Sequence, residues 1–145
     1  MASNWKAINF NHAQALQWFT SCQDLMNSHG AKVWISNEDG KILRDALAHR
    51  FCAGVDQLSD SIGRSRNADT KSKDYPKDNG MLFEVIEEWS EIVKQRDRLT
   101  HHYHKTNVSI FKSSMTEHEN FGVLLDSTRK LHALSVDKVV AEENL

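Results

Sequence analysis

This 145-residue chain has very little proline, glycine or cysteine: one proline, six glycines and two cysteines. Scarce proline and glycine argue against a fold with many turns and favour long uninterrupted helices. A disulfide is not expected between the only two cysteines of a chain of this kind. Because Cys22 and Cys52 each sit in an apolar helical pattern, we predict that both are buried free thiols.

Long apolar runs are also missing, and neither sign of charge dominates. No run approaches the ~20 apolar residues that span a bilayer, and the opening MASNWKAINF lacks the apolar core of a signal peptide. We therefore expect a cytoplasmic protein without a membrane partner. The formal net charge is -2, so any contact with RNA or a nucleotide must come from a local patch. No glycine-rich phosphate loop and no Ser-His-Asp pattern is present.

What the chain does contain is a helical period. Its composition, 39% hydrophobic and 26% charged, and its length are typical of one soluble domain covering residues 1–145. Apolar residues recur three and four positions apart in four stretches. These stretches cover residues 11–28, 38–63, 80–99 and 106–134. We predict an all-α, antiparallel up-and-down four-helix bundle.

Several residues suggest where these helices begin and end. Asn11 is a plausible N-cap of the first helix, and His29-Gly30 a plausible stop. The second helix is expected to start after Asn37 and to end at Gly63. Residues 63–80 are nearly free of apolar side chains and read as a long polar loop between helices 2 and 3, either solvated or a contact surface.

The C-terminal third leaves one alternative open. Thr116 and Glu119 have the spacing of a capping box, so residues 106–134 form either one helix or two. The tail, residues 135–145, is weakly helical by pattern and is expected to fray.

The densest polar pattern is WSEIVKQRDRLTHHYH, residues 89–104. Trp89, Arg96 and Tyr103 are seven residues apart, so on a helix they lie nearly on one line, which apolar residues flank. Arg96 therefore continues an apolar stripe, where a guanidinium is costly unless an anion meets it. It either snorkels or pairs with a carboxylate, or it is placed to bind a phosphate.

Arg96 and His101 are five residues apart, which is about 140° on an ideal helix. Either the helix ends near Thr100, or the two side chains serve different surfaces, or a second chain completes the site. A twofold dimer through this helix would gather two Arg96 and two His101 side chains. Two histidines can act as proton acceptor and donor while arginines stabilise phosphate charge, which allows RNA cleavage through the 2′-hydroxyl without metal.

A metal site is the competing interpretation of this segment. His101, His102 and His104 are close in sequence, but zinc usually takes three or four protein ligands, and no cysteine or carboxylate partner is evident nearby. We expect no native metal site and no cofactor. His102 and His104 are predicted to be exposed residues near a helix end, where they interact well with the helix dipole.

Arg96-Asp97-Arg98-Leu99-Thr100-His101-His102-Tyr103 fits the R-x4-H-x-Y pattern and resembles HEPN domains. The most similar group is the HepT and nucleotidyltransferase-substrate-binding proteins, whose pattern Trp89 also fits. The resemblance extends to segments of the first two predicted helices. These segments are Trp5, Asn9-Phe10 and Ala15-Leu16, then Leu43-Arg44-Asp45-Ala46-Leu47 and Arg50-Phe51.

This resemblance implies a dimerising four-helix bundle paired with a minimal nucleotidyltransferase, many such pairs being toxin–antitoxin modules. It implies that the chain is the metal-independent endoribonuclease toxin, with Arg96 and His101 catalytic. Asp97 occupies a polar position, often Asn in the family, that helps orient the pair. Tyr103 is the residue that the partner can modify with AMP.

Two alternatives remain. In the first, the chain is a non-catalytic subunit that binds nucleotide or substrate for the nucleotidyltransferase. In the second, the motif is only an interface, in which Arg96 pairs across a dimer with Asp97 or Glu91.

Overall fold

The computed structural model describes residues 5–67, 91–100, 107–116 and 121–144, and these form helices with no β-strand among them. The all-α prediction is therefore confirmed for this part of the chain. No helix within it is long and apolar enough to cross a membrane. Residues 91–100 form a helical segment. The other elements are α1 (Trp5–His29), the 3-10 helix η1 (Gly30–Trp34), α2 (Glu38–Asn67), α5 (Val108–Thr116) and α6 (Phe121–Glu143).

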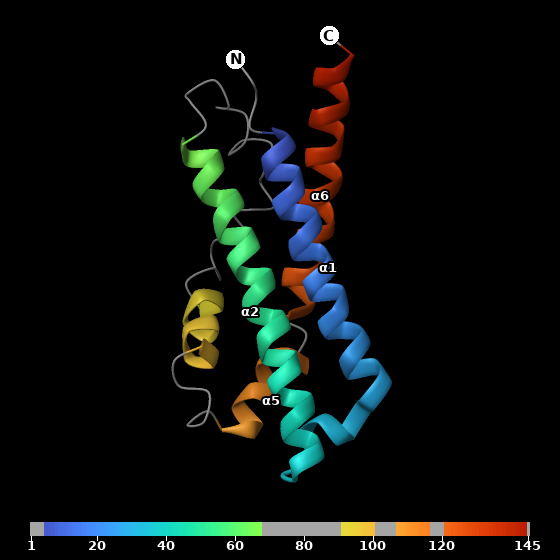
Figure 1. The fold of residues 1–145 in the computed structure, drawn as a ribbon, viewed down its shortest axis with the longest axis vertical. Coiled ribbons are helices and arrows are strands. Elements are labelled where there is room, and N and C mark those ends of the chain that lie inside the picture. The colour runs from blue at the N-terminus through green and yellow to red at the C-terminus, as the bar shows by residue number, and fades with distance from the viewer. Residues whose placement is uncertain (1–4, 68–90, 101–106, 117–120, 145) are drawn as a thin grey trace.

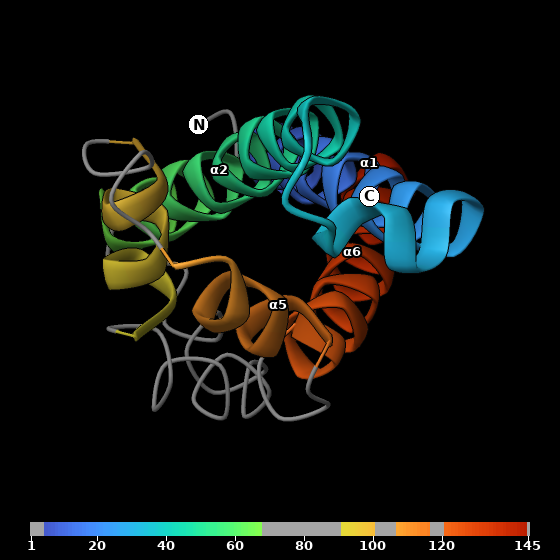
Figure 2. The same ribbon diagram turned by 90° about the horizontal axis from the view of Figure 1, so that it is seen from below.

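The helices surround one elongated core. Helices α1 and α2 lie side by side in opposite directions and are joined at one end by η1, and α6 packs along α1 (Figure 1). Viewed along the long axis, α5 and the segment 91–100 complete a ring with α2, α1 and α6 (Figure 2). The segment 91–100 lies beside α2, and Arg96 of the segment contacts Asp56 of α2 although they are 40 positions apart in the sequence.

Phe19 of α1 is the centre of the core. It is fully buried, and its ring centroid lies 6.3 Å from that of Phe51 on α2 and 6.0 Å from that of Phe121 on α6. Gly54 of α2 allows this close approach, because a Cβ there would lie 2.7 Å from Phe19 Cδ1. One aromatic side chain therefore fixes the spacing of three helices.

The expected boundaries between the first two helices are confirmed. Helix α1 ends at His29, and Gly30 follows with a φ of 54°, the left-handed conformation that glycine adopts without strain. Helix α2 begins at Glu38, and the Asn37 Oδ1 accepts a 2.7 Å hydrogen bond from the Gly40 backbone N–H. Asn37 is therefore the N-cap of α2.

Helix α1 begins at Trp5, so the prediction of Asn11 as its N-cap was wrong. Asn11 is buried within the helix, and its Nδ2 donates a 2.8 Å hydrogen bond to Gln57 Oε1 of α2. A polar residue ahead of an apolar period can serve as a cap or as a buried interhelical contact. The sequence alone does not separate these roles.

The prediction that Gly63 ends the second helix was also wrong, because α2 continues to Asn67. One glycine costs a helix only about 1 kcal/mol relative to alanine, and the nearest proline is Pro76. The first residues of the predicted polar loop, 64–67, thus belong to α2. Residues 68–80, the rest of that loop, lie outside the described residues, as do residues 80–90 of the predicted third helix.

The C-terminal segment forms two helices, α5 and α6, as one of the two alternatives predicted. The expectation of a fraying tail was wrong, since α6 extends to Glu143. Ser135 is buried, and its Oγ donates a 2.9 Å hydrogen bond to Asn9 Oδ1 of α1. The Lys138 ammonium lies 5.8 Å from the centroid of the Trp5 ring. These contacts attach the tail to the first turns of α1.

Candidate functional site

Segment 91–100 carries Arg96 and is attached to the core by its inner face. Ile92, Gln95 and Leu99 are each at least nine-tenths buried, at the three- and four-residue spacing of one helix face. The last turn of the segment contacts α2 at Cys52. The Cys52 Sγ lies 3.7 Å from the carbonyl oxygen of Arg96, and the Thr100 hydroxyl donates to the same sulfur at 3.6 Å. These contacts hold the Arg96 backbone against α2.

The Arg96 guanidinium is bound by two carboxylates of its own chain. Its Nε and Nη2 donate to the two oxygens of Asp56 on α2, at 2.8 and 3.2 Å, and its Nη1 donates to Asp97 Oδ1 at 3.0 Å. The hydrogen bonds to Asp56 and then to Asp97 raise the pKa of Arg96 above its ordinary value. Each nitrogen donates one bond here, so N–H groups on both terminal nitrogens are still available.

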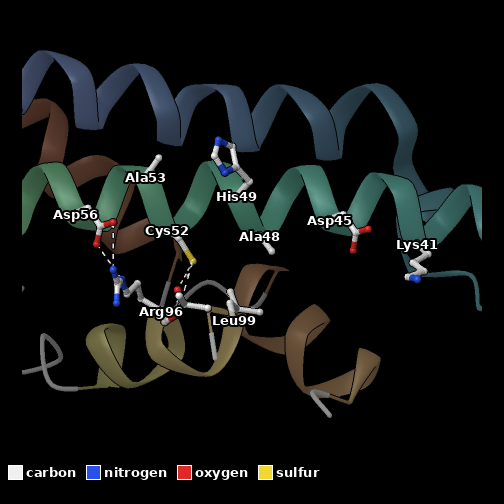
Figure 3. A pocket seen from close by; sticks show the side chains of 10 residues that line it. Lys41, Asp45, Ala48, His49, Cys52, Ala53, Asp56, Arg96 and Leu99 are labelled. Carbon is white, nitrogen blue, oxygen red and sulfur yellow. Dashed lines mark hydrogen bonds and ion pairs between the residues drawn. The ribbon is translucent and has the colours of Figure 1, made fainter. Parts of the chain in front are cut away.

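Arg96 stands at one end of an open groove of about 630 Å³ between α2 and the segment 91–100. Figure 3 shows Asp56 and Arg96 at one end and Lys41 and Asp45 toward the other. His49 lies between these ends and meets the Trp18 ring edge-on, with centroids 5.7 Å apart. Among the described residues, the lining is Lys41, Asp45, Ala48, His49, Cys52, Ala53, Asp56, Arg96, Leu99 and Thr100.

The charges along this groove largely balance one another. Lys41 and Arg96 are cationic, while Asp45 and Asp56 are anionic. Because a bidentate carboxylate already compensates Arg96, an anionic ligand entering the groove must compete with Asp56 for the guanidinium. The groove is therefore suited to a ligand with both anionic and neutral hydrogen-bonding groups, and less suited to a bare anion.

Cys52 is the only thiol at the groove within the described residues, and it is poorly suited to nucleophilic chemistry. Burial raises its pKa, an effect that the hydrogen bond from Thr100 and the charge of Arg96 only partly oppose. Since the thiolate is the nucleophilic form, Cys52 remains a protonated structural side chain. Cys22 is fully buried, and burial raises its pKa to about 12. Both cysteines are free, as predicted, but only Cys22 is buried as expected, and Cys52 is half-buried at the groove.

The described residues contain two of the four predicted site residues. Arg96 and Asp97 are adjacent on the segment 91–100 and share a hydrogen bond. His101 and Tyr103, together with His102 and His104, lie outside the described residues, so their position relative to Arg96 remains a prediction. Within the described ranges, no group of three or more histidine, cysteine or carboxylate side chains could hold a metal ion.

The carboxylate that sequence reasoning anticipated for Arg96 was Asp97 or Glu91 of a second chain. Asp97 does contact Arg96, but within one chain, and Glu91 instead pairs with Lys94 at 3.2 Å. Asp56 was missed. A signal for it exists in the sequence, because polar residues recur three or four apart on one side of α2. They are Lys41, Asp45, His49, Cys52 and Asp56.

Two further arginines from the HEPN-like pattern contact backbone carbonyls. The Arg44 Nη1 donates to the carbonyl oxygens of Val33 and Ile35 at 2.8 and 2.7 Å, which fixes the turn after η1. The Arg50 Nη1 donates to the Ser21 carbonyl oxygen of α1 at 3.1 Å. Both side chains link helices in this fold, and neither lines the groove.

Comparison of the chain with protein-family models, with curated proteins and with solved structures gave no match in any of the three. The functional interpretation therefore depends on the motif and on the geometry around Arg96.

Proposed function

We propose that this chain is a HEPN-type partner of a minimal nucleotidyltransferase, and that it is the metal-independent endoribonuclease, the toxin, of a toxin–antitoxin pair. In this proposal the helices form an antiparallel up-and-down four-helix bundle with a long polar loop between the second and third. The protein acts in the cytoplasm as a homodimer on RNA.

The observation that carries the proposal is the placement of Arg96, the first residue of the R-x4-H-x-Y pattern. Its side chain is 28% exposed and faces an open groove, and it keeps N–H groups free for a phosphate oxygen. Charge on the phosphate grows in the transition state of RNA cleavage, and a guanidinium fixed by Asp56 stabilises that charge without reorganising.

His101 supplies the proton transfers in this proposal. One imidazole removes the proton from the ribose 2′-hydroxyl, and the imidazolium of the second chain donates a proton to the leaving 5′-oxygen. The products are a 2′,3′-cyclic phosphate and a free 5′-hydroxyl. Asp97, next to Arg96, either opposes the incoming phosphate or holds His101 in its working tautomer. Tyr103 is the residue that the partner modifies with AMP.

A growth assay tests the catalytic claim. Expression of the chain without its partner is expected to slow growth, and Arg96→Ala or His101→Ala is expected to relieve the effect. Arg129→Ala and His29→Ala are matched controls, because both side chains are exposed and lie away from the groove. Equal toxicity of the wild type and both site variants would exclude catalysis by these residues.

Cleavage of RNA by the purified protein separates this mechanism from a metal-dependent one. Activity that persists in excess EDTA supports the proposal, and activity that EDTA abolishes contradicts it. The same assay with Arg96→Ala guards against a contaminating nuclease.

The bonds of Arg96 to two carboxylates favour one alternative, a non-catalytic subunit that binds nucleotide or substrate for the nucleotidyltransferase. A compensated guanidinium contributes less to binding an anionic transition state than a free one. This alternative predicts no growth defect, with nucleotide binding that depends on the groove. A short nucleotidyltransferase reading frame beside that of this chain supports either function, and its absence favours a motif that is only an interface.

A further inference from the structure

A second, smaller cavity borders another face of the segment 91–100. It has a volume of about 90 Å³ and shares no lining residue with the groove among the described residues. Its walls come from four helical segments. The lining residues are Phe51 of α2, Ser114 of α5, Phe121 and Leu124 of α6, and Glu91, Ile92, Gln95 and Arg98 of the segment 91–100.

Gln95 is the unusual member of this lining. It is 93% buried, between Ile92 and Leu99 on the inner helix face, and its Nε2 has no hydrogen-bond partner among the described residues. Buried amide groups are nearly always hydrogen-bonded, and an orphan donor destabilises the fold. Leucine or methionine would fill this position without that cost. The orphan donor therefore points to an acceptor that enters the cavity.

The other walls restrict what that acceptor belongs to. Phe51, Phe121 and Leu124 are almost fully buried and present apolar surface, which suits a flat, largely apolar body. A volume of about 90 Å³ equals that of about three water molecules at ~30 Å³ each, so a ligand inside the cavity is no larger than one small ring. Arg98 is exposed, and its guanidinium takes part in none of the ion pairs between described residues. A negative substituent directed outward could therefore meet Arg98.

We infer that the Gln95 cavity is a binding site for a small planar heterocycle of single-ring size, whose ring carbonyl accepts a hydrogen bond from Gln95 Nε2. The Oε1 of the same amide can accept a bond from a ring N–H beside that carbonyl. A nucleotide is too large for the cavity. The inference goes beyond the proposed function and does not depend on it, because the cavity is separate from the groove at Arg96.

The test uses two probes of similar size, 2-pyridone and benzene, titrated into the full chain by calorimetry. The first carries the carbonyl and the N–H, and the second carries neither. The wild type is expected to bind 2-pyridone measurably, because the hydrogen bond to Gln95 offsets the cost of removing the carbonyl and the N–H from water. The Gln95 side-chain amide resonance should shift with 2-pyridone in a ¹⁵N-correlated NMR spectrum.

Gln95→Leu should weaken the binding of 2-pyridone by at least about tenfold while it retains benzene binding, because only the polar contact is lost. Gln17→Leu, at an exposed position of α1, is the control and should bind both probes as the wild type does. Ser114→Leu narrows the cavity without touching Gln95 and should abolish binding of both probes.

No measurable binding of 2-pyridone by the wild type would overturn the inference, as would an unshifted Gln95 amide at about 10 mM 2-pyridone. The second result would mean that water alone fills the cavity. If Gln95→Leu and Ser114→Leu fail to fold, the two wild-type measurements decide the question.

Discussion

Arg96 is a cation between two carboxylates, at the edge of a groove that is open to solvent. Asp56 binds it with both oxygens from a different helix, and Asp97 binds it from the next position along the chain. The same contacts that hold the guanidinium in one orientation also reduce its attraction for another anion. Under the proposed function, the strength of RNA binding at Arg96 is therefore expected to depend on Asp56 as well as on Arg96.

Asp56→Asn is expected to strengthen the binding of a short oligoribonucleotide by about fivefold. The amide keeps the shape of the side chain but removes a competing negative charge, and a partly exposed charge pair is worth about 1 kcal/mol. Fluorescence anisotropy at fixed ionic strength measures the effect. Asp126→Asn is the control, since Asp126 pairs with Arg129 at 3.0 Å on α6. Weaker binding by Asp56→Asn would show that Asp56 orients Arg96 for the ligand and does not compete with it.

His12 offers a separate prediction at the residue scale, on stability. It is fully buried, with its Nδ1 3.1 Å from Ser135 Oγ. Burial is the main reason that its pKa is lowered from 6.5 to about 4, and the charge of nearby His132 lowers it further, while a hydrogen bond with the Leu131 backbone opposes the shift. Between these values the unfolded chain binds a proton that the folded chain does not. Stability is therefore lost as the pH falls from 6.5 to 4.

The free energy of unfolding that is lost through His12 is on the order of 3 kcal/mol, because each unit of pKa difference between the folded and unfolded chain corresponds to about 1.36 kcal/mol. Urea unfolding of the wild type and of His12→Gln at pH 7.5, 5.5 and 4.5 measures it. The variant should be less stable at pH 7.5, and the difference between the two proteins should shrink as the pH falls. A difference that stays constant across these pH values would contradict a neutral, buried His12.

At the scale of helices, the pair α1 and α2 forms the frame on which the groove is built. Phe19 and Gly54 set the distance between the two helices, and Arg44 and Asn37 fix the turn that joins them. Helix α2 then presents its polar side, including Cys52, to the segment 91–100. A change in the spacing of α1 and α2 is therefore expected to destabilise the whole fold.

Gly54→Ala is expected to destabilise the protein by about 1–3 kcal/mol, although alanine is the better helix former. The added Cβ would lie 2.7 and 2.9 Å from Phe19 Cδ1 and Cζ, and Phe19 cannot move aside because Phe51 and Phe121 pack against it. Thermal unfolding measures the effect. Ser59→Ala, at an exposed position of α2, is the control and should leave stability equal or higher. The double variant Gly54→Ala, Phe19→Leu should recover part of the loss.

Helix existence was predictable from the sequence because it depends on local periodicity, and helix ends were predictable where a local device fixes them. Gly30 and Asn37 are such devices. The prediction for Asn11 was wrong because its role depends on a contact with Gln57 of another helix. The prediction for Gly63 was wrong because the helix continues through it to Asn67 despite the small cost of a glycine. The site divides in the same way. Arg96 and Asp97 follow from a local motif, whereas Asp56 reaches Arg96 across 40 residues, and no period links the two.

At the scale of the whole molecule, a single chain has one Arg96 and one His101. If the helix continued past Thr100, their five-residue spacing would put the two side chains about 140° apart. The formal charge of -2 gives no long-range attraction for RNA. Under the proposed function, a second chain solves the first problem by symmetry, because a twofold axis near the segment 91–100 doubles every group beside it. Catalysis and self-association are then the same requirement.

Sedimentation at micromolar concentration should therefore give about twice the chain mass of 16.6 kDa. The rate of RNA cleavage per chain should fall when the protein is diluted below the dissociation constant of the dimer. The rate falls because dissociation separates each Arg96 from the histidine of the other chain. Arg96→Ala should sediment as the wild type does but cleave no RNA, which distinguishes loss of chemistry from loss of the dimer. A chain that sediments at 16.6 kDa and still cleaves RNA at a concentration-independent rate would show that one protomer contains the complete site.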